Sequence, residues 1–599
     1  MRSVGFDFGT TNTLISIISR GKVINIGDEE QSERPFPSVV RYDGEATVVG
    51  HEAKKGLSVV GLGVHENVVK SPKMYLGDDS LPVAGVERTP ASVAGEVIRY
   101  VKARALAGAQ RNLLNEEFGS IAEAVATIPV TWNGPRRAAL RDAFKLAGIE
   151  VAQFVHEPFA ALYGRLRAAE PDDRQLRSMS RQNLLVVDWG GGTLDITLCR
   201  VEDGRVAQLT NGGDAEVGGD RFDEAIALQV IESFRGQEGQ GTSARLRAGA
   251  QAAVLADVER AKIDLSSSER GDKTLFVEGV FDDSPGDLKY RLNRDELEHA
   301  TRELVRTGID KVKSVLSTAG LAETQIAQVL VVGGMSAMPA IQSQLFELFG
   351  PERVDISERS GTLVAEGAAW VAHDNCRLVL SKPVELQLAR SAFYTLVNTT
   401  TEMGHGWKDR VPLYCTDPTD GVAKFLFCTP QRICSVPQSS DRRLTLGTLN
   451  LPVDKGGRAL VDRIELDVYV DPDLILRMEA TNVQTGETAY TEIHELAFGL
   501  PLPTPGEDDL EMSLDHDTKV SVEGQPGELS VRANLTRDPK NIDAIPGEVL
   551  DRDPIHRQKF MRKSPFGEAT PEQTYERLYS RPCAKCGRRI NDPDCHCGS

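Results

Sequence analysis

The sequence predicts an α/β portion made of two related lobes, followed by a β-sandwich and a small cysteine-rich tail. A strand, an Asp-x-Gly turn and a returning strand occur twice among the first 375 residues, each followed by alternating strands and helices. Beyond residue 377, short strands of alternating polarity replace the helical pattern. The chain has 599 residues, which is too long for one hydrophobic core and predicts several domains.

Composition argues against some classes of function. The net charge of -19 opposes general binding to nucleic acid or to an anionic membrane surface. No long uncharged apolar stretch predicts a membrane span, and no signal-like segment precedes the first strand. The nine cysteines form no disulfide framework, so we expect a protein of the reducing cytoplasm.

The two copies of the repeat share one pattern. In the first, a strand over 4–8 runs into Asp7-Phe-Gly-Thr-Thr-Asn-Thr, and a strand returns over 14–18. In the second, a strand over 184–187 runs into Asp188-Trp-Gly-Gly-Gly-Thr-Leu-Asp before a strand returns. This repetition predicts an internal duplication.

Each copy continues with a strand and a helix. The first has a strand over 124–128 and a helix over 135–146. The second has an all-apolar strand over 329–332 and a helix over 339–349 that opens on a proline. This alternation is typical of α/β lobes.

The second half of the chain has a different pattern of apolar and polar residues. Turn residues separate alternating runs over 423–428, 443–449, 464–470 and 475–480, which predicts the β-sandwich. From Leu500 the chain is acidic and Pro-rich, typical of a linker, apart from one candidate hairpin over 519–532. The expected segments are an α/β domain over 1–376 (lobe I about 1–182 and 355–376, lobe II about 183–354), a linker over 377–383, the sandwich over 384–498, a partly disordered linker over 499–580 and the tail over 581–599.

Both Asp-x-Gly turns carry residues suited to binding phosphate. Glycine lets a ligand approach the backbone, and successive turn amides form an anion-binding nest. The donors are Gly9, Thr10, Thr11 and Asn12 in the first turn, and Gly190, Gly191, Gly192 and Thr193 in the second. Asp7 and Asp188 end the adjoining strands, where carboxylates hold hydrated magnesium. One such turn alone is more often only a turn, but the pair favours two loops that clamp a nucleotide triphosphate.

These motifs resemble the nucleotide-binding domain of the 70-kDa heat-shock chaperones of the DnaK type, within the actin and sugar-kinase superfamily. The resemblance covers residues 1–375. It rests on Gly5-Phe-Asp-Phe-Gly-Thr-Thr-Asn-Thr, Ile128-Pro-Val-Thr-Trp-Asn, His156-Glu-Pro-Phe-Ala-Ala-Leu, Asp188-Trp-Gly-Gly-Gly-Thr-Leu-Asp, Gly218-Gly-Asp-Arg-Phe-Asp, Glu259-Arg-Ala-Lys-Ile-Asp-Leu-Ser and Val332-Gly-Gly-Met-Ser-Ala-Met-Pro. It implies a two-lobed actin-like (ribonuclease H-like) ATPase that binds ATP or ADP with magnesium.

The resemblance also implies roles for single residues. Lys73 would steady the γ-phosphate and the attacking water, and Glu157, Asp188 and Asp195 would organise metal and water. The other implied contacts are Thr10, Thr11, Asn12 and Thr193 at the phosphates, Gly191, Gly192, Gly218, Gly219, Gly333 and Gly334 at phosphate or ribose, and Glu259, Lys262 and Ser266 at ribose and adenine. Two alternatives stay open: Lys70 rivals Lys73, and Glu259 with Lys262 could be a helix-surface pair.

The chain departs from the family pattern at several positions. Ala337 stands where many members have an arginine that stacks on adenine, and Gly361 replaces an acidic residue. His156 replaces an asparagine, and Gln153 stands where an arginine used in J-domain docking is expected. The apolar run at 378–380 resembles the family's interdomain linker, but no helical lid follows the sandwich.

The tail contains four closely spaced cysteines, Cys583, Cys586, Cys595 and Cys597. Four thiolates, or three with His596, suit a tetrahedral zinc site of ribbon type. The alternative is a redox-active or unstructured tail. Neighbouring basic residues would let this module dock a protein or a nucleic acid.

Three hypotheses follow. The first is an ATP-dependent chaperone with polypeptide clients, which by resemblance implies a J-domain co-chaperone and a nucleotide-exchange factor. The second is a nucleotide-dependent scaffold or regulator dedicated to one partner, favoured by the missing lid. The third, a small-molecule kinase of the same superfamily, is opposed by the predicted sandwich.

Overall fold

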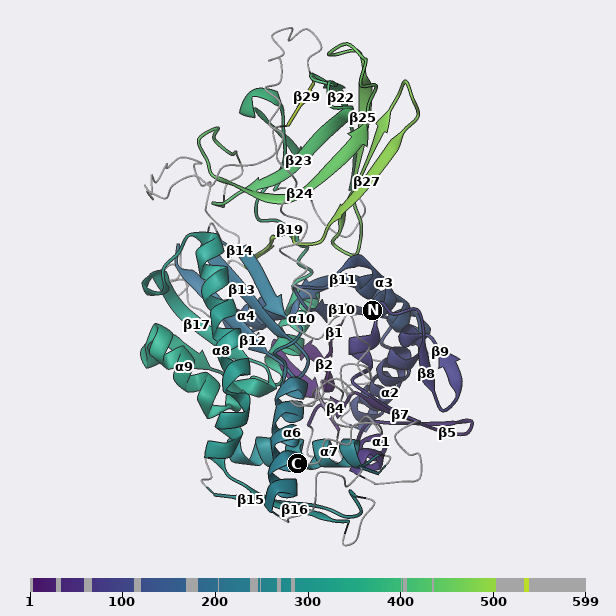
Figure 1. Ribbon diagram of the computed structural model, residues 1–599, viewed down its shortest axis with the longest axis vertical. Coiled ribbons are helices and arrows are strands. Elements are labelled where there is room, and N and C mark those ends of the chain that lie inside the picture. Colours follow the sequence, from purple (N-terminus) through teal and green to yellow (C-terminus); the bar gives the residue numbers. More distant parts are fainter. Residues whose placement is uncertain are drawn as a thin grey trace, which may run out of the picture.

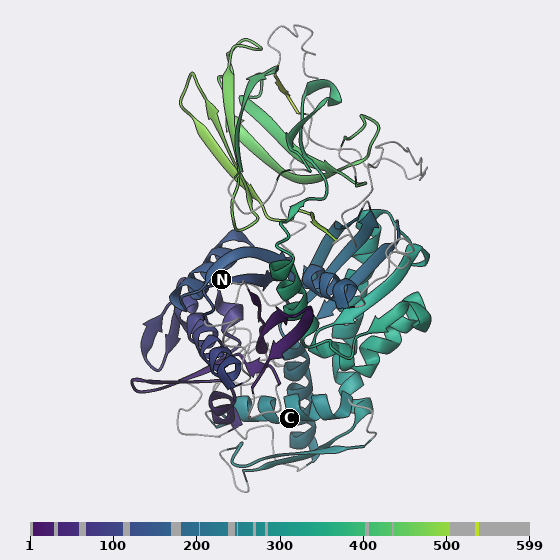
Figure 2. The ribbon, with the colours of Figure 1, turned by 180° about the vertical axis from the view of Figure 1, so that it is seen from behind.

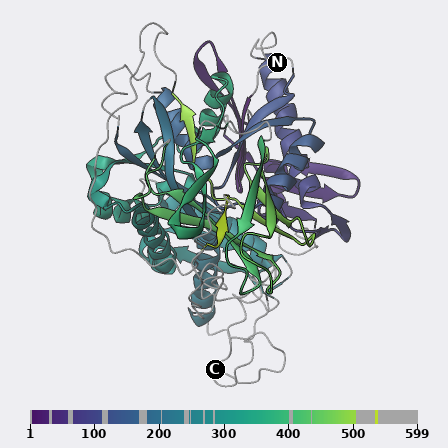
Figure 3. The same cartoon turned by 90° about the horizontal axis from the view of Figure 1, so that it is seen from above.

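The computed structural model describes residues 4–28, 34–58, 67–111, 120–168, 181–202, 204–237, 246–247, 249–266, 271–281, 286–399, 401, 407–433, 436–502 and 533–537. Two α/β lobes lie side by side, and a β-rich unit lies at one end of the long axis (Figure 1). The view from behind shows the same arrangement (Figure 2), and from above the β-rich unit overlies both lobes (Figure 3). The candidate hairpin over 519–532 and the cysteine-rich tail lie outside the described residues.

Lobe I is built on a six-stranded sheet of order β11-β10-β1-β2-β3, in which β4 also pairs with β2. Its strands are β1 (Val4–Phe8), β2 (Asn12–Ser19), β3 (Lys22–Ile26), β4 (Phe36–Pro37), β10 (Glu123–Ile128) and β11 (Glu150–His156). Its longer helices are α2 (Pro90–Arg111), α3 (Gly134–Leu146), α4 (Glu157–Ala168) and α10 (Leu363–His373). Because helices α2 and α10 pack against the sheet, β1 and β2 are buried almost throughout.

Lobe II is built on a seven-stranded sheet of order β18-β17-β12-β13-β14-β28-β19. Its strands are β12 (Asn183–Trp189), β13 (Leu194–Glu202), β14 (Arg205–Asp214), β17 (Ile326–Val332), β18 (Val354–Ile356), β19 (Val379–Leu380) and β28 (Phe498–Pro501). Its helices are α6 (Gly219–Gln237), α7 (Ala250–Ser266), α8 (Arg294–Ala319) and α9 (Pro339–Phe349), and a separate hairpin joins β15 (Lys273–Val277) to β16 (Leu288–Leu292).

The two main sheets repeat one topology. The order β11-β10-β1-β2-β3 of lobe I corresponds to β18-β17-β12-β13-β14 of lobe II. In both, the first strand of the repeat is antiparallel to the next strand and parallel to a later one: β1 with β2 and β10, β12 with β13 and β17. This agrees with the predicted duplication and brings the two Asp-x-Gly turns to equivalent positions.

Small elements complete lobe I and touch lobe II. They are β5 (Val39–Asp43), β6 (Ala46–Val49), α1 (His51–Lys55), β7 (Val68–Lys70), β8 (Leu81–Val83) and β9 (Val86–Arg88), with a 3-10 turn over Pro72–Tyr75. Ala53 and Leu57 pack with Ala252 and Ala256 of α7. The lobes therefore meet directly at the end away from the β-rich unit.

The β-rich unit consists of a four-stranded sheet, β21-β20-β23-β24, and a five-stranded sheet, β27-β26-β25-β22-β29. The strands are β20 (Val384–Gln387), β21 (Phe393–Val397), β22 (Trp407–Cys415), β23 (Val422–Pro430), β24 (Arg443–Pro452), β25 (Arg463–Val470), β26 (Leu476–Asn482), β27 (Thr488–Ile493) and β29 (Leu535–Thr536). Alternate residues of β25 are buried, as period-2 patterning predicts. The four runs predicted from alternation correspond to β23, β24, β25 and β26.

After β27 the chain returns to lobe II, which the sequence analysis did not predict. Strand β28 pairs with β14 on one side and with β19 on the other. The predicted boundary between residues 498 and 499 cuts this strand and is wrong here. The apolar side chains of Leu496, Phe498, Leu500 and Leu502 alternate along the segment and are all buried, which outweighs the prolines that suggested a linker.

Two further findings concern the described part of the chain. Cys199, Cys376, Cys415 and Cys428 are free thiols. Among the helices of the described ranges, none combines the length and apolar character needed to cross a membrane.

Candidate functional site

The two Asp-x-Gly turns face each other where the lobes meet. A Cβ atom added at Gly191 would lie 1.9 Å from Thr11 Oγ1, and one added at Gly192 would lie 2.5 Å from Thr10 Oγ1. Real Cβ atoms essentially never approach so closely, so a larger residue at either position would force the facing threonine side chain to shift. The structure therefore brings the two predicted phosphate-binding turns together.

Both turns are held from behind. Ser38 donates its amide to Thr11 O (2.9 Å) and its hydroxyl to Gly9 O (2.8 Å). The amides of Gly219 and Asp220 donate to two carbonyls of the turn 190–192, at 3.0 and 2.7 Å. A Cβ added at Gly218 would lie 2.2 Å from a carbonyl carbon of that turn, so this glycine is also required. Residues outside the turns thus donate to the carbonyls of Gly9, Thr11, Gly190 and Gly191, which suits a loop that offers amides to an anion.

Lys73 and Glu157 form a buried ion pair beside the turns. Lys73 Nζ lies 2.5 Å from Glu157 Oε1, and both residues are more than nine-tenths buried. The ammonium also lies 5.3 Å from the centre of the Trp132 ring. Ser71 adopts a left-handed backbone (φ 56°) that turns the chain into the 3-10 segment carrying Lys73. A non-glycine residue in this conformation is strained, as is common at functional sites.

Three aspartates surround this pair. Asp188 and Asp195 are direct partners in the β12–β13 ladder, and Asp7 accepts from Thr127 Oγ1 at 2.8 Å. Burial raises the pKa of Asp7 to about 6 and that of Asp195 to about 7, and in both cases Glu157 adds to the rise. The pKa of Asp188 is raised well above its ordinary value for the same two reasons.

The charges of this cluster do not balance. Four carboxylates, Asp7, Glu157, Asp188 and Asp195, lie around a single ammonium. Burial alone would lower the pKa of Lys73, but Glu157 and Asp7 outweigh it, so Lys73 stays charged and still leaves an excess of carboxylate. Such an excess suits a divalent cation. Within the described ranges, no three carboxylate, imidazole or thiolate groups converge on one metal position. The carboxylate oxygens of the cluster are ligands of the kind that hydrated magnesium takes.

Lys70 belongs to a different cluster, between the lobes. Its Nζ lies 3.0 Å from Asp220 Oδ1 and 3.6 Å from Glu259 Oε2, and Glu259 Oε1 also accepts from Lys54 at 2.7 Å. Although burial would raise the pKa of Glu259, Lys70 and Lys54 lower it to about 2. Lys70 and Lys54 thus join lobe I to helices α6 and α7, whereas Lys73 faces the carboxylates. Of the two lysines, Lys73 is therefore the one that faces the carboxylate cluster.

The residues expected at ribose and adenine lie along α7 and after β17. Lys262 Nζ lies 2.8 Å from Asp223 Oδ1 and donates to Gly219 O at 3.1 Å. Because Lys262 and Glu259 are both buried and bind other partners, they do not form a helix-surface pair. Ser266 is half-buried at the last position of α7. Gly333 has φ 84°, and a Cβ there would lie 2.6 Å from Asp188 Oδ1. Gly334 and Ala337 are the exposed residues of the 3-10 turn that follows, in which Met335 and Ser336 are buried.

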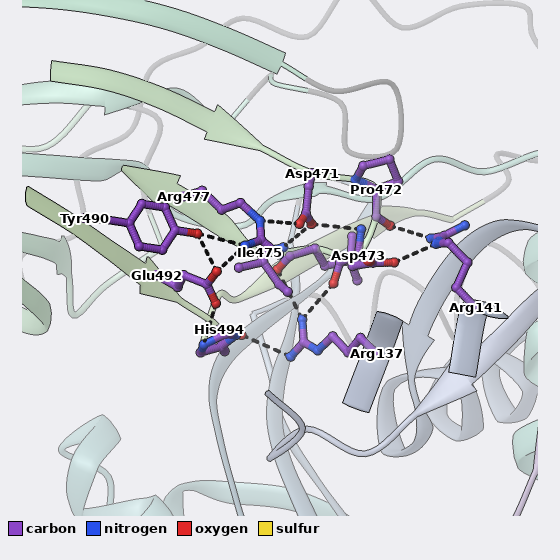
Figure 4. Close-up of polar contacts among 11 residues, drawn as sticks. Arg137, Arg141, Asp471, Pro472, Asp473, Ile475, Arg477, Tyr490, Glu492 and His494 are labelled. Atoms are coloured by element: carbon purple, nitrogen blue, oxygen red, sulfur yellow. Dashed lines mark hydrogen bonds and ion pairs between the residues drawn. The ribbon is translucent and has the colours of Figure 1, made fainter. Parts of the chain in front are cut away.

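Sequence analysis missed the residues that join α3 to the β-rich unit. Arg137 is fully buried and donates to the carbonyls of Asp473 (3.0 Å), Leu474 (3.2 Å) and His494 (3.2 Å) (Figure 4). Arg141 lies 2.7 Å from Asp473 Oδ1. The two arginines lie four residues apart on one helix face, but this spacing does not identify their partners.

Gln153 and His156, which depart from the family pattern, both contact other segments of the chain. Gln153 Oε1 accepts from Leu378 N at 2.9 Å, and Gln153 Nε2 donates to Cys376 O at 3.3 Å. His156 lies against Phe498, with ring centres 5.5 Å apart. Both residues therefore contact segments that connect the lobes with the β-rich unit.

Comparison with known proteins agrees with this geometry. The family model described as Hsp70 protein matches residues 3–81 and 77–374, well over half of the chain. A relative from Mycoplasma mycoides subsp. mycoides SC, described as "Chaperone protein DnaK", is 30% identical over 370 residues. That match covers 61% of this chain and 58% of the relative, so it spans less than two thirds of the relative's length. The chain belongs to the Hsp70 protein family.

Proposed function

We propose that the protein is an ATP-dependent chaperone of the 70-kDa heat-shock type, in which ATP hydrolysis between the lobes controls polypeptide binding by the β-rich unit. The observation that carries this proposal is the buried Lys73–Glu157 pair among three aspartates, beside two glycine turns that face each other. Family membership supports the same activity.

The chemistry assigned to the site is hydrolysis of the terminal phosphate. Phosphoryl transfer needs positioning and charge neutralisation more than covalent participation by the protein. The turns at 9–12 and 190–193 bind the phosphates through amides and hydroxyls. The Lys73 ammonium neutralises charge on the γ-phosphate, and Glu157 with Asp195 orients the attacking water. Magnesium, when bound near Asp7 and Asp188 through water, would supply further charge neutralisation.

The nucleoside end of the ligand would lie near Glu259, Lys262, Ser266, Gly333 and Gly334. The ion pairs of Lys54 and Lys70 with α6 and α7 hold the lobes together close to this end. With Ala337 exposed and short, adenine would depend on the α7 residues for recognition.

The two sheets of the β-rich unit are assigned to polypeptide binding as a sandwich of the family's type. An extended segment would be bound through backbone hydrogen bonds and apolar pockets. A J-domain co-chaperone and a nucleotide-exchange factor are the partners this function calls for. The free thiols of the described cysteines support a reducing, cytoplasmic location.

One observation favours the alternative of a scaffold or regulator dedicated to one partner. The β-rich unit is joined to lobe II by two strands, β19 before it and β28 after it, and to lobe I by the contacts of Arg137 on α3. A unit held at both ends has less freedom to separate from the lobes than one on a single linker.

We further propose that Cys583, Cys586, Cys595 and Cys597 bind zinc, and one experiment tests both metals. The purified full-length chain should contain about one zinc per molecule. Treatment with EDTA should abolish ATP hydrolysis, and magnesium alone should restore it, because zinc in the tail takes no part in the reaction. Purified chain without zinc would reject the tail site. Hydrolysis that persists without magnesium would contradict the role assigned to Asp7 and Asp188.

A further inference from the structure

The segment over 496–502, which follows the β-rich unit, is built into lobe II. Leu496, Phe498, Leu500 and Leu502 are each more than nine-tenths buried. Strand β28 pairs with β14 and β19, and Leu502 N donates to Gly204 O at 2.8 Å. A strand hydrogen-bonded on both edges and buried along its length is a structural part of the lobe.

Phe498 connects this segment with β11. Its ring lies against the ring of His156, at an interplanar angle of 58°. Gln208 of β14 joins the two residues: its Oε1 accepts from Phe498 N at 2.8 Å, and its Nε2 lies 3.3 Å from His156 Nδ1. His156 Nε2 has no hydrogen-bond partner among the described residues. Apolar packing against Phe498 and the single contact with Gln208 therefore hold the imidazole.

His156 is the last residue of β11, and Glu157 is the first residue of α4. The backbone that places the His156 ring also places the Glu157 carboxylate, which pairs with Lys73. His156 is 1% exposed, and burial, with Arg137 nearby, lowers its pKa to about 3, so the ring is neutral. A displaced neutral ring would shift the adjoining peptide without introducing a charge.

We propose that Phe498 is a positioning residue for ATP hydrolysis: strand β28 holds His156, and through it Glu157, so that the β-rich unit is linked to the hydrolysis site by a second segment besides 377–383. This inference rests on the proposed ATPase function. The linker contacts lobe I through Gln153, whereas β28 contacts the residue next to Glu157. A conformational change in the β-rich unit that displaces residue 494 would therefore also displace Phe498, and through His156 it would alter the position of Glu157.

The test is the kinetics of ATP hydrolysis by the full-length chain with Phe498→Ala. We expect kcat to fall about 10- to 100-fold, as small misplacements of a catalytic group cause, while the KM for ATP stays unchanged. Leu500→Ala is the matched control, because it removes a buried apolar side chain from the same strand roughly 7 Å further along. We expect this control to keep kcat close to that of the wild type. Phe498→Leu, which retains apolar cover over His156, should recover most of the activity.

A double-mutant cycle with His156→Asn decides whether Phe498 acts through His156. If it does, the combined variant loses no more kcat than the larger single loss. Additive losses, or an equal loss of kcat in Leu500→Ala, would overturn the proposal and assign β28 a general structural role. Should Phe498→Ala not fold, the cycle is run with Phe498→Val, which removes the ring packed on His156 but keeps an apolar, β-branched side chain in the strand, and the same criteria apply. A wild-type chain that hydrolyses no ATP would instead overturn the proposed function itself.

Discussion

Replacing Lys73 with alanine is expected to reduce kcat for ATP hydrolysis by about 100-fold or more, the usual loss when one buried donor to a developing charge is removed. Within the described ranges, Lys73 Nζ is the one ammonium in contact with Glu157, at 2.5 Å. Without it, the carboxylates of Asp7, Glu157, Asp188 and Asp195 would repel the phosphates. Single-turnover hydrolysis with bound ATP measures the chemical step directly.

Lys70→Ala is the matched control for this change. It also removes one ammonium from the same short segment, but Lys70 contacts Asp220 and Glu259 rather than Glu157. We expect the rate of single-turnover hydrolysis to be largely retained. Release of bound nucleotide should be faster, because the ion pairs of Lys70 with lobe II are lost. Equal loss of the chemical step in both variants would contradict the assignment of Lys73.

The second large effect is expected at Arg137. Its guanidinium donates to carbonyls of three separate segments, at Trp132, Leu474 and His494 among others. In Arg137→Ala these buried carbonyls lose a charged donor, so we expect stability to fall by about 3 kcal/mol. Denaturant unfolding measures this loss. Hydrogen exchange should report it as faster exchange over 471–475, where the β-rich unit meets α3.

Arg136→Ala is the control for charge and helix position. Arg136 is the neighbouring residue on α3 and is only half-buried. It should change stability by less than about 0.5 kcal/mol. Unchanged exchange over 471–475 in Arg137→Ala would show that Arg137 does not hold the β-rich unit against α3.

Much of the architecture follows from local sequence. The two Asp-x-Gly turns identify the paired lobes because glycine and aspartate are needed there both for the turn and for phosphate. The helix over 339–349 was predicted from the proline that opens it, and α9 has these bounds. Strands β25 and β26 were recognisable because buried and more exposed residues alternate along them.

Contacts between distant segments were not predictable in the same way. Nothing near residue 137 shows that its side chain binds carbonyls more than 330 residues away. Strand β28 was missed because Pro501 at its end and the prolines at 503 and 505 suggested a linker. The alternation of Leu496, Phe498, Leu500 and Leu502 was the signal available. The roles of Lys70 and Lys73 could be separated only when their partners in other segments were known.

The measurement that tests the central claim most directly is the affinity of the full-length chain for a fluorescently labelled unfolded polypeptide, with saturating ATP and with saturating ADP. If hydrolysis between the lobes controls the β-rich unit, the two dissociation constants should differ by roughly fivefold or more. After ATP is added, the dissociation constant of Lys73→Ala should stay at the value for ATP, whereas that of the wild type should change with time to the value for ADP. Equal affinities in both nucleotides would contradict the chaperone function and leave the β-rich unit as a fixed scaffold.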